Sequence, residues 1–570
     1  MKLDRKTAPG PLEPAPFNIP PAFRVTLPNG LRVVIFDNER LPLVSYRLAF
    51  LTGGAEDPPD QTGVSSAMAT MLTEGTDSYS SKELAEKIER LGASLSANSS
   101  DDFTVIAGSA LSVYSSDILQ LMAEVVFAPT FPQNELDLYK RNAMENLKFQ
   151  RSQPNFLANE QTARVLFGKH PYGTIAPAPA DIERLDADTL RAARERIFLP
   201  NNAVLIAVGD VRKDELMREI EEHFGDWEAG DRHEHHFDPP HPLGRRLMTV
   251  VDRPGSAQAN IVISNLAVPR SHPDYFPLLV MNQVLGAGAS SRVFMNLREE
   301  KGYTYGAYTR FDLKRLAGTF EATTEVRTAV TGDSLREFFY EFDRIRKDAV
   351  LEEELDDAKN FLTGVFPIRA ETQEGLTNLI VNQELYGLPH DYLDTYRDNI
   401  DAVSVEDVLR VATEYIRPDG ASLVIVGDAA GMLSQIEGYA DDIRIFDKDG
   451  REMAIETFQT DTDAAAADLA GEWELSLDFQ GQQVPITMNL EQDGDKVNGT
   501  LTTMLGEGTI SEGRVAGNRI TAAAVTEIQG QSVEFAIAGN VNGDVISGTI
   551  STAIIPDSLE FSGSRKQGVS

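Results

Sequence analysis

The sequence has no cysteine in its 570 residues, and this absence removes several kinds of chemistry at once. Disulfides, cysteine nucleophiles and thiolate metal sites are all excluded. No run of about 18 apolar residues occurs, so we expect no membrane-spanning helix. The proline-rich start, MKLDRKTAPGPLEPAP, lacks the apolar core of a secretory signal, and residues 1–16 are predicted to be disordered. Removal of a signal peptide would favour a periplasmic or extracytoplasmic location; otherwise we expect a cytoplasmic one.

Positive charge is scarce. The chain has 52 lysines and arginines but 88 aspartates and glutamates, which gives a formal net charge of −36 at pH 7. A chain this acidic repels nucleic acids and anionic membrane surfaces, and it attracts basic partners or basic peptides. We therefore expect no nucleic-acid partner.

Histidine is also scarce, with eight in the chain, and none forms a helical pair suited to zinc. Four of them cluster in the segment DRHEHHFDPPHP: His233, His235, His236 and His241. Its prolines and polar residues are typical of a connector. A connector rarely supplies the hydrogen-bond partners that orient metal-bound imidazoles. We therefore predict no functional metal site there.

The two halves of the chain repeat one pattern. FLPNNAVLIAVGD, which begins at Phe198, is echoed by YIRPDGASLVIVGD, which begins at Tyr415. Each has a proline-containing turn and an apolar run ending in Gly-Asp, and an amphipathic helix follows. A repeat this long indicates two similar α/β domains, since solenoid repeats span only about 20 to 50 residues. We place these domains at residues 17–231 and 245–446, joined by a linker at 232–244.

Local signals indicate both strands and helices in the first domain. FRVTLPNGLRVVIF contains two alternating runs around Asn29-Gly30, which predicts a β-hairpin. SSKELAEKIERLGA begins with Ser80 and has Glu83 three residues later, the pattern of a capping box at a helix start. The expected fold class is therefore α+β.

The C-terminal region, residues 471–570, has a different sequence pattern from the two preceding domains. It follows a polar, alanine-rich linker at 447–470. Six segments have strand character: WELSLDF, VPITMNLEQ, KVNGTLTT, RITAAAV, SVEFAIAGNV and DVISGTI. Turn signals such as Asp493-Gly494 separate them. This pattern predicts a small antiparallel sandwich or barrel. Trp473, in its first strand, is predicted to be a core residue.

The segment at residues 63–76, GVSSAMATMLTEGT, is predicted to form a core-packed helix. Its apolar residues recur at i, i+4, i+7 and i+8, which places them on one face: Val64, Met68, Met71 and Leu72.

The same segment resembles the zinc-binding helix of the pitrilysin-type M16 metallopeptidases, the family of insulin-degrading enzyme and mitochondrial processing peptidase. The family motif reads Gly-x-x-His-x-x-Glu-His-Met-Leu-x-x-Gly-Thr. Ser66 and Thr70 occupy its two histidine positions, and Ala69 occupies its glutamate position. Zinc needs imidazoles or carboxylates here, and hydroxyls and a methyl group cannot replace them. The resemblance therefore implies a non-catalytic member with a degenerate zinc site.

The third zinc ligand of the family is a glutamate on a long helix further along the chain. In YKRNAMENLKF that register falls at Asn146 or Leu147, with Glu145 one residue away. Without the histidines, a lone glutamate on a helix is usually a solvated charge. We therefore expect the third ligand to be lost as well.

A second motif is intact. Residues 290–309, SSRVFMNLREEKGYTYGAYT, resemble the family's C-terminal substrate-positioning motif, whose arginine and tyrosine correspond to Arg298 and Tyr305. In the family this pair reaches the zinc helix, binds the peptide backbone and stabilises the developing oxyanion. Guanidinium and phenol groups are suitable donors for that role. The alternative interpretation is that Arg298 pairs with Glu299 or Glu300 and that Tyr305 packs in a strand.

The resemblance implies two homologous domains that form a clam-like chamber, with the C-terminal β domain as an addition. Loss of one motif and retention of the other predict a heterodimer. A partner chain would carry His-x-x-Glu-His and its zinc, and this chain, without a metal, would supply Arg298 and Tyr305 in trans for the cleavage of peptides. Two alternatives stay open: a structural or assembly subunit, and a clamp that binds peptides without hydrolysis.

Overall fold

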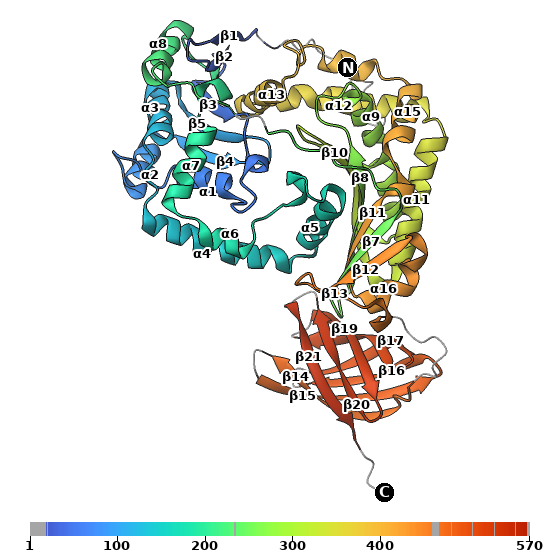
Figure 1. Ribbon diagram of the computed structural model, residues 1–570. Coiled ribbons are helices and arrows are strands. Elements are labelled where there is room, and N and C mark those ends of the chain that lie inside the picture. The colour runs from blue at the N-terminus through green and yellow to red at the C-terminus, as the bar shows by residue number, and fades with distance from the viewer. Residues whose placement is uncertain are drawn as a thin grey trace, which may run out of the picture.

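The computed structural model describes residues 19, 21–232, 235–458, 467–479, 482–503, 506–528, 531–552 and 555–566. The predicted disorder of residues 1–16 lies outside these ranges. The described strands form two open sheets and one closed barrel, and helices cover the open sheets (Figure 1). The prediction of an α+β fold with an additional β domain is confirmed. No helix in the described ranges is both long and apolar enough to cross a bilayer.

The first sheet contains six strands within the described residues, in the spatial order β1 (Phe23–Thr26), β2 (Arg32–Asp37), β6 (Ala203–Gly209), β3 (Leu43–Phe50), β5 (Thr104–Leu111) and β4 (Ser94–Ser99). β2 and β6 are parallel, and the other pairs are antiparallel. The predicted hairpin is β1 and β2. Gly30 in its turn has a φ of 91°, a conformation that glycine adopts without strain.

The helices of this domain are α1 (Val64–Met71), α2 (Ser81–Arg90), α3 (Ser115–Phe127), α4 (Gln133–Ser152), α5 (Pro154–Phe167), α6 (Pro179–Arg184), α7 (Ala187–Ile197) and α8 (Lys213–Phe224). α1, α3, α7 and α8 bury one face of the first sheet. The predicted capping box begins α2, because the Glu83 amide donates to Ser80 Oγ while the Ser80 amide donates to the Glu83 carboxylate.

The second sheet follows the order β13 (Glu452–Met453), β12 (Asp442–Phe446), β7 (Leu247–Asp252), β11 (Ser422–Gly427), β8 (Gln258–Ala267), β10 (Gly318–Arg327) and β9 (Thr304–Leu313). The order β7-β11-β8-β10-β9 repeats the order β2-β6-β3-β5-β4 of the first sheet. The two domains are therefore duplicates, as the echo of the two Gly-Asp segments predicts.

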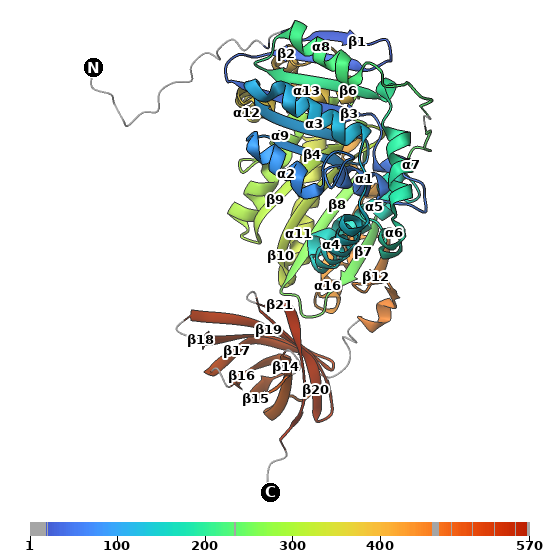
Figure 2. The same ribbon diagram turned by 90° about the vertical axis from the view of Figure 1, so that its left-hand side faces the viewer.

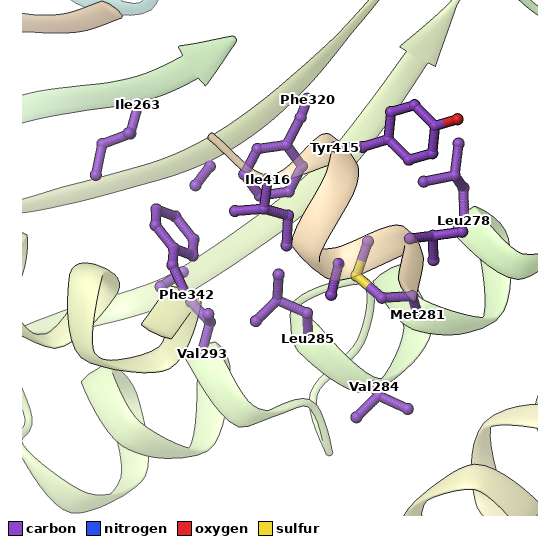
Figure 3. Packing of buried hydrophobic residues seen from close by; sticks show 14 of the residues in the cluster. Ile263, Leu278, Met281, Val284, Leu285, Val293, Phe320, Phe342, Tyr415 and Ile416 are labelled. Atoms are coloured by element: carbon purple, nitrogen blue, oxygen red, sulfur yellow. The ribbon is translucent and has the colours of Figure 1, made fainter. Parts of the chain in front are cut away.

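The helices of the second domain are α9 (Tyr275–Leu285), α10 (Arg292–Phe294), the π-helix η5 (Met295–Glu300), α11 (Thr331–Lys347), α12 (Glu352–Glu371), α13 (Gln373–Leu385), α14 (Tyr396–Asp401), α15 (Val405–Tyr415) and α16 (Ala429–Ile436). Buried residues of α9, α11, α15 and α16 pack on one face of the second sheet. Figure 3 shows Met281 and Leu285 of α9 in this core, together with Phe342 of α11 and Ile416.

The two domains exchange one helix each (Figure 1). α5, from the first domain, covers the other face of the second sheet, where Leu157 and Ala158 pack among buried valines of β7, β8 and β11. α13, from the second domain, lies against the first sheet, and Gln373 Nε2 donates to the carbonyl of Val208 at 2.9 Å. Neither sheet is therefore covered on both faces by its own domain alone.

A charged contact also joins the domains. Arg315, in the turn between β9 and β10, donates through its guanidinium to Glu56 at 3.1 Å and to the Leu51 carbonyl at 2.8 Å. Its backbone amide donates to Asp102 at 2.9 Å, and the hydroxyl of Tyr172 donates to the same carboxylate. We call these four residues, Arg315, Glu56, Asp102 and Tyr172, the domain latch.

The C-terminal domain is a closed antiparallel barrel of eight described strands: β14 (Gly471–Phe479), β15 (Gln482–Asp493), β16 (Lys496–Thr503), β17 (Gly506–Ala516), β18 (Arg519–Ile528), β19 (Gln531–Asn542), β20 (Val545–Thr552) and β21 (Ile555–Arg565). β14 and β21 pair to close it. The predicted small antiparallel domain is confirmed as a barrel, although its sequence indicated only six strands. Trp473 is fully buried inside, as expected, and Arg565 lies over its ring.

The barrel contacts the second domain below the sheet (Figure 2). Arg519, at the start of β18, donates to both carboxylate oxygens of Asp428 at 2.7 and 3.0 Å. Asp428 precedes α16 and is almost fully buried. The Asp252 carboxylate, at the end of β7, accepts a hydrogen bond from the amide of Ala429 at 3.0 Å. The contact between the barrel and the second domain therefore combines two buried acids with one arginine.

Candidate functional site

The helix that resembles a zinc-binding helix is α1, and its predicted apolar stripe is buried. Its N-terminus is held by Asp57, whose carboxylate accepts hydrogen bonds from the amides of Gly63 at 2.9 Å and Ser65 at 3.3 Å. Arg196 lies 3.4 Å from the same carboxylate. Burial nevertheless raises the pKa of Asp57 to about 6. A carboxylate from outside the helix thus takes the place of an N-cap side chain.

The degenerate positions of α1 differ in exposure. Ser66 and Thr70 are exposed one turn apart, and Thr70 Oγ1 donates to the carbonyl of Ser66 at 2.9 Å. Ala69, at the glutamate position, is 0% exposed. The two hydroxyls lie on the side that would face an ion, but they lack the donor strength of imidazoles.

On α4, Asn146 is exposed, and Leu147 is buried. Glu145 forms an exposed ion pair with Lys148 at 2.7 Å, which agrees with the interpretation of a solvated charge. Across the described ranges, no group of three histidines or acids is placed to hold a metal ion. The hydroxyls of Ser66 and Thr70 and the amide of Asn146 do not fit the zinc ion of a hydrolytic M16 site. No zinc-dependent step is therefore assigned to this chain.

The π-helix η5 presents Arg298. Its side chain is 43% exposed, pairs with Glu299 and lies over the ring of Phe294, with 5.2 Å between the guanidinium carbon and the ring centre. A π-helix is a rare conformation that often occurs at functional sites. Tyr305, at the start of β9, is 91% exposed. The alternative interpretation is therefore right about the pairing of Arg298 with Glu299 and wrong about the packing of Tyr305.

Two donors are thus exposed on elements of the second domain that contact each other, η5 and β9. The Tyr305 hydroxyl forms no hydrogen bond within the described part of the chain, and among the described residues Arg298 forms an ion pair only with Glu299 and a ring contact only with Phe294. No hydrogen bond or ion pair joins either side chain to α1 across the described residues. The structure therefore keeps both groups accessible but does not connect them to the degenerate helix.

A buried polar group anchors η5, and the sequence analysis missed it. Asn296 Nδ2 donates to Glu341 at 2.9 Å and to Glu337 at 3.3 Å, and all three side chains are buried. Both glutamates belong to α11. Glu337 and Glu341 are one helical turn apart and lie on the same face as the apolar residues of α11. Acids are unusual on a buried face, so this spacing was the signal in the sequence. Since Asn296 is two residues from Arg298, this anchor fixes the backbone that presents Arg298.

Two family models match adjacent parts of the chain. "Insulinase (Peptidase family M16)" matches residues 32–177, and "Peptidase M16 inactive domain" matches residues 184–362. The chain belongs to the M16 peptidase family. It is a non-catalytic member, since it lacks the His-x-x-Glu-His motif but retains the arginine and the tyrosine of the C-terminal motif. The expected resemblance is confirmed.

Similar proteins cover the two M16 domains. The "Uncharacterized zinc protease YmxG" of Bacillus subtilis is 24% identical over 72% of this chain and 99% of its own length. The "Non-peptidase homolog YmxG" of Helicobacter pylori is 25% identical over 66% of this chain and 87% of its own length. A crystal structure of a peptidase M16 inactive domain from Pseudomonas fluorescens has a TM-score of 0.67 and 25% identity, covering 71% of this chain and 98% of the other.

A protease structure from Helicobacter pylori has the same TM-score at 19% identity, with 71% of this chain and 99% of the other covered, and it supports the fold alone.

Proposed function

We propose that this chain is the non-catalytic subunit of a heteromeric M16-type zinc peptidase. A partner with His-x-x-Glu-His and zinc cleaves the peptide. This chain binds the peptide backbone and donates hydrogen bonds to the developing oxyanion through Arg298 and Tyr305. The observation that carries the proposal is the exposure of Tyr305, whose hydroxyl forms no hydrogen bond with the described residues, in the motif that also contains Arg298.

The physical chemistry of the two side chains supports this role. A guanidinium and a phenol stabilise a tetrahedral oxyanion when a closed, water-poor site holds them in place. In the isolated chain these donors face solvent, so a second surface must enclose them before they act in this way. The loss of the zinc ligands explains why that surface belongs to another chain. The net charge of −36 favours a partner or peptide with basic residues.

The test is purification of the tagged full-length chain from its own organism, followed by an assay of chelator-sensitive peptide cleavage in the eluate. Arg298→Ala and Tyr305→Phe should each lower kcat/KM by about 100-fold while the same partner is retained, because each removes one oxyanion donor. The control is Tyr308→Phe, since Tyr308 is also an exposed tyrosine of β9 but is not the tyrosine that the motif pairs with the arginine.

Two results would contradict the proposal. Cleavage that co-purifies and is unchanged in both variants would identify a structural or assembly subunit. Absence of any zinc-dependent cleavage would leave a peptide clamp, which calorimetric titration of the isolated chain with basic and acidic peptides would then detect or exclude.

A further inference from the structure

The outer face of α12 has an apolar stripe with a glycine at its centre. Phe361 and Ile368, two turns apart, are 52% and 65% exposed. Gly364 lies between them, and a Cβ added there would meet no atom within 4 Å. Figures 1 and 2 place α12 at the outside of the second domain. The stripe therefore has two apolar projections and a gap that nothing in the described chain fills.

Crowding within the described chain does not explain this glycine. Glycine in an exposed helix interior is about 1 kcal/mol less favourable than alanine. Alanine would fit at position 364 without a clash. Pro367, inside the same helix, removes the hydrogen bond to the carbonyl of Thr363 and so disturbs the backbone next to Gly364. The missing side chain does, however, allow another surface to approach the backbone of α12 closely. The exposed Phe361 and Ile368 would gain burial from the same approach.

Charge determines the orientation of that approach. Four acids near the start of α12 are exposed and form no ion pair within the described residues: Glu352, Glu353, Asp356 and Asp357. The other end of α12 has two arginines against one acid, since Arg40 pairs with Glu371 at 3.1 Å and Arg369 is exposed without an ion pair in the described chain. The first end is strongly negative, and the second is net positive.

We propose that this face docks a second copy of the chain, with the two α12 helices antiparallel and their two-fold axis at Gly364–Val365. The midpoint between Phe361 and Ile368 falls at this position. Phe361 of each copy therefore packs near Ile368 of the other, and the glycines lie at the closest approach. Antiparallel pairing also places the positive end of each helix on the acidic end of the other, whereas parallel pairing would oppose the two acidic ends.

This interface is isologous, so one stripe serves both copies. It does not depend on the proposed peptidase role, because Arg298 and Tyr305 lie on other elements.

The net charge of −36 opposes self-association at long range, and this predicts a specific response to salt. At about 0.15 M salt the screening length is about 8 Å, so repulsion between distant acids is largely removed. The apolar stripe is not weakened by salt. The dimer should therefore be stronger at about 0.15 M than at about 0.01 M salt, and it should persist at higher salt.

Sedimentation velocity of the full chain between about 1 and 100 μM tests the association, since a single helix stripe supports micromolar rather than nanomolar affinity. The wild type should shift from monomer to dimer, and Phe361→Ser/Ile368→Ser should stay monomeric. Gly364→Ala should weaken association at least about tenfold while it raises the melting temperature, because the helix gains stability. Gly438→Ala and Val113→Ser are the matched controls, since both positions are exposed elsewhere, and both variants should dimerise normally.

Cysteine cross-linking tests the arrangement, and the cysteine-free chain gives a clean background. Under mild oxidation Gly364→Cys alone should form a disulfide-linked dimer, because the same residue of both copies lies at the axis. Phe361→Cys mixed with Ile368→Cys should cross-link, whereas Phe361→Cys alone should not. The Gly438→Cys variant is the control and should stay uncross-linked.

Three results would overturn the proposal. A wild type that stays monomeric at every concentration and salt would leave the stripe to an unlike partner. Dimerisation unaffected by Phe361→Ser/Ile368→Ser would place the interface elsewhere. Efficient cross-linking of Phe361→Cys with itself would show a parallel arrangement.

Discussion

At the scale of single residues, position 69 decides whether α1 could recover metal chemistry. Ser66→His and Thr70→His add imidazoles at exposed positions and should leave the free energy of unfolding within about 0.5 kcal/mol of the wild type. Ala69→Glu places a carboxylate at a fully buried position. It should lower the free energy of unfolding by about 3 kcal/mol or more. Urea unfolding of the three variants checks this, and a stable Ala69→Glu protein would contradict it.

Asp252 gives a prediction about pH. Burial, together with the nearby charge of Asp428, raises its pKa from 3.8 to about 6. The folded protein thus holds this proton more tightly than the unfolded chain does. The resulting stabilisation is complete below about pH 4 and is lost as the pH rises through about 6, a change of up to about 3 kcal/mol.

Asp252→Asn keeps an acceptor for the Ala429 amide without the charge, so it should be more stable than the wild type at pH 7.5 and nearly equal to it at pH 4. Urea unfolding at the two pH values checks this. Part of the slope should remain in the variant, because Asp57 also has a pKa raised to about 6 and the same sign. An unchanged pH dependence in Asp252→Asn would show that Asp252 is not the group responsible.

At the scale of elements, short sequence patterns correctly predicted the features that depend on contacts between residues close together in the sequence. The Asn29-Gly30 hairpin, the capping box of α2 and the buried stripe of α1 all depend on residues within one or two turns of each other. β17 and β21 were missed, because Gly506, Gly508 and Gly513 interrupt the first and Pro556 the second. Closure of the barrel supplies the partner strands that stabilise these weak sequences.

The helix exchange could not be predicted, because the partners of α5 and α13 are far away in sequence. Gln373 shows how specific it is. Gln373→Ala removes the donor for the carbonyl of Val208 inside the domain interface and should lower the free energy of unfolding by about 1 to 3 kcal/mol. Chemical denaturation measures this. Glu371→Gln, which breaks only the exposed pair with Arg40, is the control and should change stability by less than about 0.5 kcal/mol.

At the scale of the whole molecule, charged hydrogen bonds between residues far apart in the sequence join the domains. The domain latch joins the two M16 domains, and Arg519 joins the barrel to the second of them. Tyr172, which follows α5 in the sequence, takes part in the first contact. Sequence could show neither contact, since each acid and its arginine belong to different domains.

Arg519→Ala tests the position of the barrel. The change leaves Asp428 buried without its arginine and next to Asp252, so the barrel should detach from the second domain. Small-angle scattering should show a larger radius of gyration, and hydrogen exchange should increase at the start of α16. Arg514→Ala, which breaks an exposed pair in the same barrel, is the control. Equal scattering curves for the two variants would mean that other contacts position the barrel.

The exchange of α5 and α13 also has a consequence during synthesis. When the ribosome has made β6, all six strands of the first sheet exist, but one face of that sheet stays uncovered until α13 emerges much later. α5 meanwhile waits for a sheet that has not yet been translated. Nascent chains of this protein should therefore depend on chaperones until residue 385 has left the exit tunnel. For the same reason, a gene divided between the two domains should yield fragments that fold only when they are made together.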